Sequence, residues 1–172
     1  FLYFSLRSSL PLYEGELLSD VSQSVGISRD AQGYASIKGQ NRNDVAYALG
    51  FVHAQERFFQ MDLLRRNASG ELSELFGEMA LELDKKRRVH RFRTKAERGF
   101  AALPAEQKLL LQRYTAGVNA GLAELGWPPF EYGLLAQTPR KWVEADSFLV
   151  LYSMYLDLQG SEGKDELAMG LM

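Results

Sequence analysis

Strongly polar side chains occupy a segment that otherwise has apolar residues on almost every side. These polar residues are Gln55, Glu56, Arg57, Gln60, Arg65 and Arg66. Because a buried charge is tolerated only when it is paired and hydrogen-bonded, the pattern predicts a polar network inside the protein or across an interface. Such a cluster could serve catalysis or bind a metal, but structural ion pairs use the same residue types, and we favour a structural network.

His53 lies in the same segment. No second histidine or carboxylate accompanies it at a zinc spacing such as HExxH, so we interpret it as a satisfied core residue. The chain has no cysteine, which excludes disulfides, thiolate metal sites and a cysteine nucleophile. It also contains no glycine-rich phosphate loop and no GxSxG nucleophile turn. On these residues alone, no catalytic centre is identified.

Residues 85–98 carry eight Lys or Arg side chains and one acid, Glu97, which gives this stretch a net charge of +7. A basic helix can bind nucleic acid or an anionic membrane surface. Here the charges surround an apolar stripe, no stacking platform of aromatic residues is interleaved, and the whole chain has a net charge of −2. We favour a solvated face or one that docks on an acidic partner. The alternative function is a non-enzymatic helical adaptor that binds a polyanion through helix 85–98.

The elements that must position these residues are a hairpin and a series of helices. Alternation over residues 21–37, interrupted at 30–33, predicts a β-hairpin. The spacing then becomes helical, with Asn43 or Asp44 expected as the first N-cap and a stop near Gly70. This helix is apolar on more than one side and should be deeply buried. A lone hairpin is marginal in water, so we expect the rest of its sheet in another chain.

The remaining chain continues as helices, without an alternating strand–helix pattern. Asp84 is expected to cap one long helix that carries an apolar stripe as far as Leu103. Pro104 is expected at the first position of the next helix, and Asp146 as the cap of the last. The layout is therefore a small hairpin followed by about five helices.

The length of 172 residues and a content of 46% hydrophobic and 24% charged residues suit one globular unit. We predict a single unit over residues 1–172, with an N-terminal arm and hairpin at about 1–40 and a helical part at about 43–172. The apolar run 1–6 is far shorter than the ~20 residues of a membrane span, and it could be the tail of an export signal or an N-terminal strand. Because the chain begins with Phe1, we expect a longer gene product.

Motifs along nearly the whole chain resemble the α chain of the penicillin acylase family of N-terminal-nucleophile hydrolases. They are Arg29-Asp30-x-x-Gly33, Asn43-Asp44, ALGFVHAQERxxQMD at 48–62, RRxAxGELSExFG at 65–77, Asp84 with Arg87 and Arg88, Tyr114-x-x-Gly117-Val118-Asn119-Ala120, and Trp142-x-x-x-Asp146. The stretch 48–77 is highly specific for that family.

The resemblance implies an α+β fold, in which a mostly helical α chain completes an αββα sandwich with a separate β chain. It implies a precursor that cuts itself, so that a Ser at the new N-terminus of the β chain becomes the nucleophile, activated by its own α-amine. This chain would carry no catalytic residue of its own. The implied activity is hydrolysis of N-acyl amides with an apolar acyl group, acyl-homoserine lactones or β-lactams, in the periplasm or outside the cell.

The resemblance also assigns substrate-binding residues to the last helix. Met154 matches a methionine of the acyl pocket, and Leu158 matches a pocket aromatic. Their apolar character suits an acyl group, although a place in the core would suit it nearly as well. Where penicillin G acylases have an arginine beside that aromatic, this chain has Asp157, so specificity for penicillin G does not carry over.

A structural Ca²⁺ is implied as well, held in that family mostly by β-chain carboxylates and by one glutamate of the α chain. Glu162 is the nearest match, and Asp165 and Glu166 lie close enough in the sequence to compete with it. Solvated charges are an equally good interpretation of the three side chains.

Overall fold

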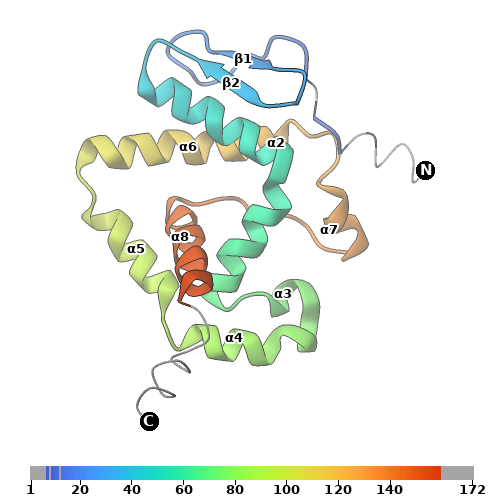
Figure 1. Cartoon of the computed structure of the whole chain (residues 1–172), viewed down its shortest axis with the longest axis vertical. Helices are drawn as coiled ribbons and strands as arrows, with labels where there is room; N and C mark the ends of the chain where they lie inside the picture. The colour runs from blue at the N-terminus through green and yellow to red at the C-terminus, as the bar shows by residue number, and fades with distance from the viewer. Residues whose placement is uncertain (1–6, 8, 12, 160–172) are drawn as a thin grey trace, which may run out of the picture.

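The structure is a computed structural model that describes residues 7, 9–11 and 13–159 (Figure 1). Its elements in chain order are β1 (Gly26–Arg29), β2 (Ala35–Lys38), α2 (Arg42–Ser69), α3 (Ser73–Phe76), the 3₁₀ helix η1 (Gly77–Ala80), α4 (Leu81–Arg88), α5 (Phe92–Ala102), α6 (Ala105–Ala123), α7 (Phe130–Leu134) and α8 (Glu144–Leu158). A mostly helical chain with a small two-stranded sheet agrees with the expected α+β class. Among the described residues, no helix is long and apolar enough to cross a membrane.

The hairpin is formed by β1 and β2, which pair antiparallel with Ile27 opposite Ile37. Asp30 closes the turn, because its carboxylate accepts hydrogen bonds from two backbone N–H groups of the turn. Gly33 has a φ of +87°, a conformation that a side chain rarely permits. The predicted hairpin is confirmed, but its first strand is short, because residues 21–25 form no strand.

The first long helix begins earlier than expected. Its N-cap is Asn41, whose side-chain oxygen accepts a 2.9 Å hydrogen bond from the backbone N–H of Asp44. The expectation of Asn43 or Asp44 as the cap is therefore wrong. The Asp44 carboxylate accepts instead from the side chain and backbone of Ser22, at 2.6 and 2.9 Å, and these bonds hold the pKa of Asp44 well below its usual range. This contact fastens the segment before the hairpin to α2.

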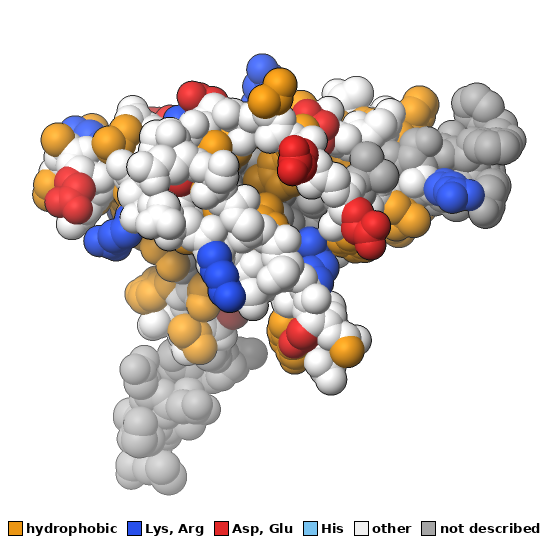
Figure 2. Space-filling view, turned by 90° about the horizontal axis from the view of Figure 1, so that it is seen from above, with side chains coloured by type: hydrophobic (Ala, Val, Ile, Leu, Met, Phe, Trp, Pro, Cys, Tyr) orange, Lys and Arg blue, Asp and Glu red, His pale blue; other side chains and the backbone are white. Residues whose placement is uncertain are grey.

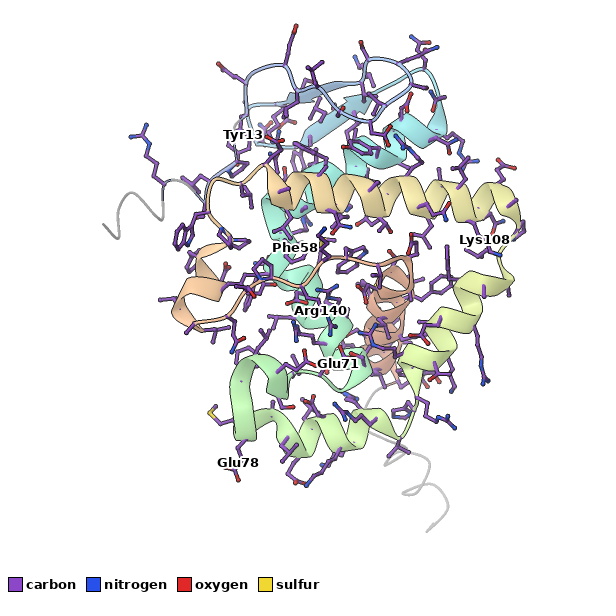
Figure 3. The ribbon with its side chains drawn as sticks, turned by 180° about the vertical axis from the view of Figure 1, so that it is seen from behind. Tyr13, Phe58, Glu71, Glu78, Lys108 and Arg140 are labelled. Carbon is purple, nitrogen blue, oxygen red and sulfur yellow. The ribbon has the colours of Figure 1, made fainter. Side chains whose placement is uncertain are left out.

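Helix α2 crosses the molecule from the hairpin to α3 and α4, and α6 and α8 pack along it (Figure 1). Phe58, near the middle of α2, points into the interior (Figure 3). The apolar core consists of two clusters along this helix. They are Ala54, Phe58, Met61, Leu75, Val118, Tyr132 and Trp142, and then Ala68, Phe92, Ala96, Ala145 and Leu149. The deep burial expected of α2 is confirmed.

Glycines allow α2 and α6 to approach at backbone contact. A Cβ added to Gly117 of α6 would collide with the carbonyl of Tyr47, and one added to Gly121 would collide with the carbonyl of Phe51. In the other direction, a Cβ on Gly50 would strike the carbonyl of Tyr114. The two helices can therefore pack this closely only without side chains at these positions.

The long helix expected from Asp84 to Leu103 is instead two helices. Helix α4 ends at Arg88, and α5 starts after Arg91, which has a left-handed φ of 54°. Asp84 lies inside α4, and its carboxylate accepts from the backbone N–H groups of Leu72 and Ser73, at 2.9 and 2.7 Å. The carboxylate thus accepts from N–H groups that would otherwise be unpaired at the start of another helix, α3. The local sequence pattern does not reveal this interaction.

The boundaries of the later helices also differ from the expectation. Pro104 is the N-cap of α6 instead of its first residue. Helix α7, which comes after the loop 127–129, has no counterpart among the expected helices. Helix α8 has Val143 as its N-cap, so the expectation of Asp146 as the cap is wrong. Asp146 is the third residue of α8, and its carboxylate accepts a 2.9 Å bond from the backbone N–H of Val143.

Candidate functional site

Helix α8 has two apolar faces, and the described residues of this chain cover only one of them. Ala145, Leu149 and Ser153 follow one another at four-residue spacing and are 7%, 0% and 0% exposed. They face α2 and α5, where Leu149 belongs to a core cluster with Phe92. This inner face holds the helix against the body of the molecule.

The opposite face carries a second apolar stripe with helical spacing. It consists of Leu151, Met154, Tyr155 and Leu158, which are 60%, 51%, 52% and 80% exposed. We call these four residues the outer stripe of α8. An apolar stripe left open on a well-anchored helix is typical of an interface or of one wall of a ligand pocket.

Both residues assigned by resemblance, Met154 and Leu158, lie on the outer stripe and not in the core of this chain. That they contact an acyl group stays a prediction. Leu151 and Tyr155 are not among the site residues expected from the sequence, although their spacing from Met154 and Leu158 is the signal that could have found them. Asp157 is exposed next to the stripe. Glu162, expected to bind Ca²⁺, lies outside the described residues.

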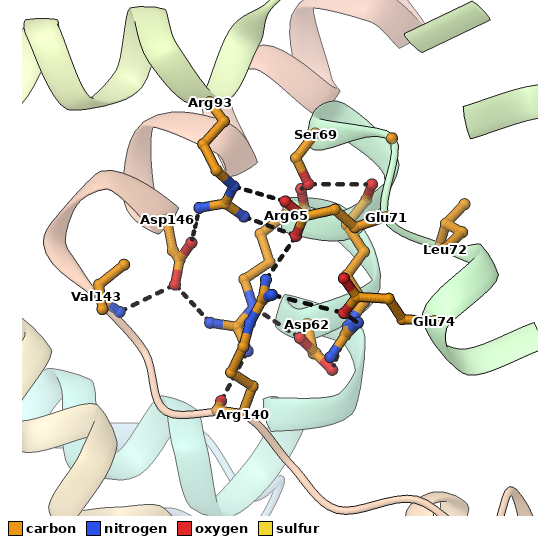
Figure 4. A network of polar contacts seen from close by, with 12 residues as sticks. Asp62, Arg65, Ser69, Glu71, Leu72, Glu74, Arg93, Arg140, Val143 and Asp146 are labelled. Atoms are coloured by element: carbon orange, nitrogen blue, oxygen red, sulfur yellow. Dashed lines mark hydrogen bonds and ion pairs between the residues drawn. The ribbon is translucent and has the colours of Figure 1, made fainter. Parts of the chain in front are cut away.

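A buried ionic network anchors helix α8 to the rest of the molecule. The centre of this network is Asp62 of α2 (Figure 4). The Asp62 carboxylate accepts from Arg65 Nε at 2.7 Å and from Arg66 Nε at 2.9 Å, and all three side chains are buried. The hydroxyl of Tyr132 donates a third bond to it at 2.6 Å, and burial together with this bond raises the pKa of Tyr132. Three donors thus occupy three of the roughly four acceptor sites of this carboxylate.

Arg65 carries the network from α2 to the start of α8. Its Nη1 donates to Asp146 Oδ2 at 2.5 Å, and its two terminal nitrogens also donate to the carbonyls of Arg140 and Lys141. Arg93 of α5 donates to the other oxygen of Asp146 at 3.1 Å. Three segments far apart in the sequence therefore meet at the first turn of α8.

Glu71 closes the network toward solvent, where Figure 3 shows it beside Arg140. It accepts two bonds from Arg93, at 2.7 and 2.9 Å, and one from Arg140 at 2.6 Å. Burial would raise the pKa of Glu71, but the bonds from the two guanidinium groups outweigh it and lower the pKa to about 2. The structural network expected for Arg65 and Arg66 is thus confirmed.

The other polar residues of the predicted cluster lie elsewhere. Residues 55–57 and Gln60 line an open hollow of about 640 Å³ between the turn of the hairpin, the start of α7, and residues 9–11 and 13. Glu56 pairs with Arg29 at 2.7 Å, and Arg57, where φ of −151° interrupts α2, lies 3.4 Å from Glu56. Across the part of the chain that the structure describes, no group of three or more acidic or histidine side chains could hold a metal. The described lining of the hollow therefore contains no metal-binding cluster.

His53 is satisfied inside the fold, as the sequence predicts. Its Nδ1 lies 3.0 Å from the hydroxyl of Tyr114, and the two rings meet edge to face. Burial lowers the pKa of His53, and the nearby Arg57 lowers it further. Burial also raises the pKa of Tyr114, to about 12. A neutral histidine bonded to a neutral tyrosine is a structural pair.

The basic stretch 85–98 does not form the single helix that the adaptor alternative requires, because it is divided between α4 and α5. Several of its cations are used within the chain: Arg88 donates to the carbonyl of Gly70, Arg93 binds Glu71, and Lys85 pairs with Glu82. The division of the stretch and these pairings disfavour a continuous polyanion-binding surface over it. Figure 2 shows a different face, at the hairpin end of the molecule, where Lys and Arg side chains are interspersed with acidic and apolar ones.

The architecture places the chain in a known class of folds. It matches a thermostable penicillin G acylase from Alcaligenes faecalis with a TM-score of 0.73, covering 83% of this chain and 77% of that chain at 24% identity. The hairpin and the helical frame around α8 are therefore the fold of a penicillin acylase chain.

Sequence comparison then shows the family. The penicillin amidase profile matches residues 24–171. The penicillin acylase 2 proenzyme of Pseudomonas sp. (strain SE83) is 42% identical over 158 residues, covering 91% of this chain and 20% of the relative. The acyl-homoserine lactone acylase QuiP of Pseudomonas putida is 30% identical over 174 residues, covering 94% and 20%. The chain belongs to the penicillin amidase family, and it spans about a fifth of the length of these curated relatives.

Proposed function

We propose that this chain is the α subunit of a heterodimeric acylase that hydrolyses N-acyl amides with an apolar acyl group. The observation that carries the proposal is the outer stripe of α8, an exposed apolar face on a helix that buried ion pairs hold in place. In this proposal the nucleophile is a Ser at the N-terminus of the β chain, and its own α-amine acts as the base. The β chain would come from the same precursor, and one relative is named a proenzyme.

The outer stripe would form one wall of the acyl pocket, and the β chain would supply the opposite wall. Burying an acyl chain against it stabilises the complex by about 0.8 kcal/mol per methylene, so the depth of the pocket selects acyl length. Asp157, exposed beside the stripe, places a negative charge near this wall. The named activities of the relatives support two substrate classes, penicillins and acyl-homoserine lactones.

Two further parts of the proposal concern the metal and the compartment. From the family resemblance we propose a structural Ca²⁺ held mostly by carboxylates of the β chain, with Glu162 as the contribution of this chain. A periplasmic or secreted location is proposed from the same family resemblance. Neither part enters the pocket chemistry.

The pocket wall is tested in the processed two-chain enzyme with Met154→Ala and Leu158→Phe. Each variant changes the volume of the wall, so kcat/KM should change by different factors for short and long N-acyl-homoserine lactones, at least about threefold in their ratio. Met79→Ala is the matched control, because Met79 is 92% exposed but lies on η1. Thermal stability is measured for all three variants.

A pocket wall and a structural role predict different results. If Met154→Ala and Leu158→Phe lower the melting temperature while the ratio between long and short substrates stays at the wild-type value, the pocket assignment is wrong. The control should change neither quantity.

A further inference from the structure

Asn67 of α2 connects three helices through one side chain. Its Nδ2 donates a 2.9 Å hydrogen bond to Ser153 Oγ of α8. Its Oδ1 accepts a 3.3 Å bond from Arg87 Nε of α4, and this second bond fixes which way the amide points. Ser153 is 0% exposed and the bond is partly buried, so water competes little for the Ser153 hydroxyl.

This bond is unlike the other contacts around it on the inner face of α8. Leu149, Phe148, Tyr152 and Leu156 pack there through apolar surfaces, which attract without a preferred direction. A hydrogen bond, in contrast, weakens steeply when its geometry changes. Together with Asp146 in the first turn, Ser153 thus gives α8 two directional anchors, seven residues or about 10 Å apart along its axis.

Rotation of α8 matters because Ser153 and the outer stripe are adjacent in the sequence. Met154, the residue directly after Ser153, lies on that stripe. At a helix radius of about 5 Å, a rotation of about 20° moves a side chain by roughly 2 Å. A shift of this size is larger than a shaped pocket tolerates without loss of selectivity.

We propose that Asn67 is a positioning residue: through Ser153 it sets the rotation of α8 and thereby the acyl-length preference of the outer stripe. The proposal rests on the proposed function of that stripe. Asn67 itself does not touch the substrate. Its effect reaches the pocket through a single, partly buried bond between α2 and α8.

The test uses the processed two-chain enzyme and N-acyl-homoserine lactones of increasing acyl length. Asn67→Leu and Ser153→Ala each remove the bond, and each should change the ratio of kcat/KM between long and short substrates by about threefold or more. Because both variants break the same bond, the double variant should shift the ratio no further than the larger single change. Asn67→Asp has nearly the same shape and keeps acceptors for the Ser153 hydroxyl and for Arg87, so it should retain the wild-type ratio.

The matched control is Ser69→Ala. Ser69 lies on α2 like Asn67, and its buried hydroxyl donates to backbone carbonyls of α2 itself and not to α8. The substitution should lower stability without changing the ratio. If the Asn67→Leu precursor fails to fold or to process itself, Ser153→Ala tests the same bond, because it removes only the hydroxyl oxygen of Ser153. The acyl-length ratio of Ser153→Ala then shows whether the bond matters.

The outcomes separate this proposal from the one on which it rests. If Met154→Ala shifts the ratio but Asn67→Leu and Ser153→Ala do not, the positioning role is overturned and the pocket wall stands. If Met154→Ala leaves the ratio flat, the proposed pocket wall itself fails. Shifted ratios in all three variants, with the wild-type ratio retained in Asn67→Asp, support both.

Discussion

At the scale of single residues, Asp62 shows how a fold tolerates a cluster of arginines in its interior. Its carboxylate lies between two buried guanidinium groups and a buried tyrosine hydroxyl. The ions no longer have water around them, so each relies on its partners for compensation. Removing one member therefore leaves an uncompensated charge, which costs more than the pair contributes.

We accordingly expect Asp62→Asn to lower the free energy of unfolding of the processed enzyme by about 3–5 kcal/mol. Glu82→Gln is the control, because it breaks the exposed pair with Lys85 and should cost at most about 1 kcal/mol. Urea unfolding of both variants measures the difference. Equal losses would show that the network around Asp62 is not buried.

Glu71 gives the same network a dependence on pH. Its pKa is about 2 in the folded protein, below the ordinary value of 4.5, so its ionised form is favoured by folding. A group with a lowered pKa contributes stability above its unfolded pKa and loses that contribution as the pH falls toward its folded pKa. The contribution of Glu71 should therefore be complete above about pH 5 and decline between about pH 4.5 and 2.

The measurement compares wild type with Glu71→Gln, which has no charge to titrate. The difference in stability should be about 1–2 kcal/mol near neutral pH, less than the full shift would give because water partly screens this edge of the network. It should shrink as the pH is lowered toward about 3. A difference that stays constant over this range would contradict the assignment of the lowered pKa to Glu71.

At the scale of elements, the close contact between α2 and α6 depends on glycines that have no room for a methyl group. A Cβ at Gly117 would overlap the backbone carbonyl of Tyr47, and a backbone cannot move aside as a flexible side chain can. The helices would have to separate, which loosens the packing of Val118 and its neighbours in the core.

Gly117→Ala should therefore destabilise the protein by about 1–3 kcal/mol or more, although alanine is the better helix former. Gly133→Ala is the control, since Gly133 lies in helix α7 and only the Trp127 side chain, at 3.9 Å, approaches its Cβ position. That substitution should be neutral or slightly stabilising. Thermal unfolding of the two variants checks the sign of each effect.

At the scale of the whole molecule, apolar surface remains exposed at separate places. The outer stripe of α8 is one, and Phe130 and Leu134, one turn apart on α7 at 47% and 76% exposure, form another. The two-stranded sheet likewise has no further strand beside it among the described residues. Surfaces of this kind are covered in stable proteins, which supports assembly with a larger partner.

We expect the chain expressed alone to aggregate or to unfold without a cooperative transition, and expect coexpression with its β chain to make it soluble. Size-exclusion chromatography and thermal scans of the two preparations provide the comparison. A monomeric isolated chain with a sharp thermal transition would contradict this expectation.

Local patterns in the sequence determined much of this architecture. Alternation and a turn at Asp30 predicted the hairpin, and apolar spacing on several sides predicted the buried helix that became α2. The motifs from 48 to 77 identified the family, because they preserve residue types and spacing together. The interpretation of Arg65 and Arg66 as structural followed from the cost of burying an unpaired charge.

Only the tertiary structure decided which distant groups those side chains would meet. Aspartate is a common N-cap residue, so the sequence favoured Asp84 and Asp146 as caps of their own helices. Asp84 instead accepts a backbone hydrogen bond at the start of α3, and Asp146 accepts from Arg65 and Arg93. The break near Arg91 and the bond from Asn67 to Ser153 likewise have no local signal. The bonds of Asp84, Asp146 and Asn67 join segments far apart in the chain, whereas sequence spacing shows only which residues within a few positions share a helix face.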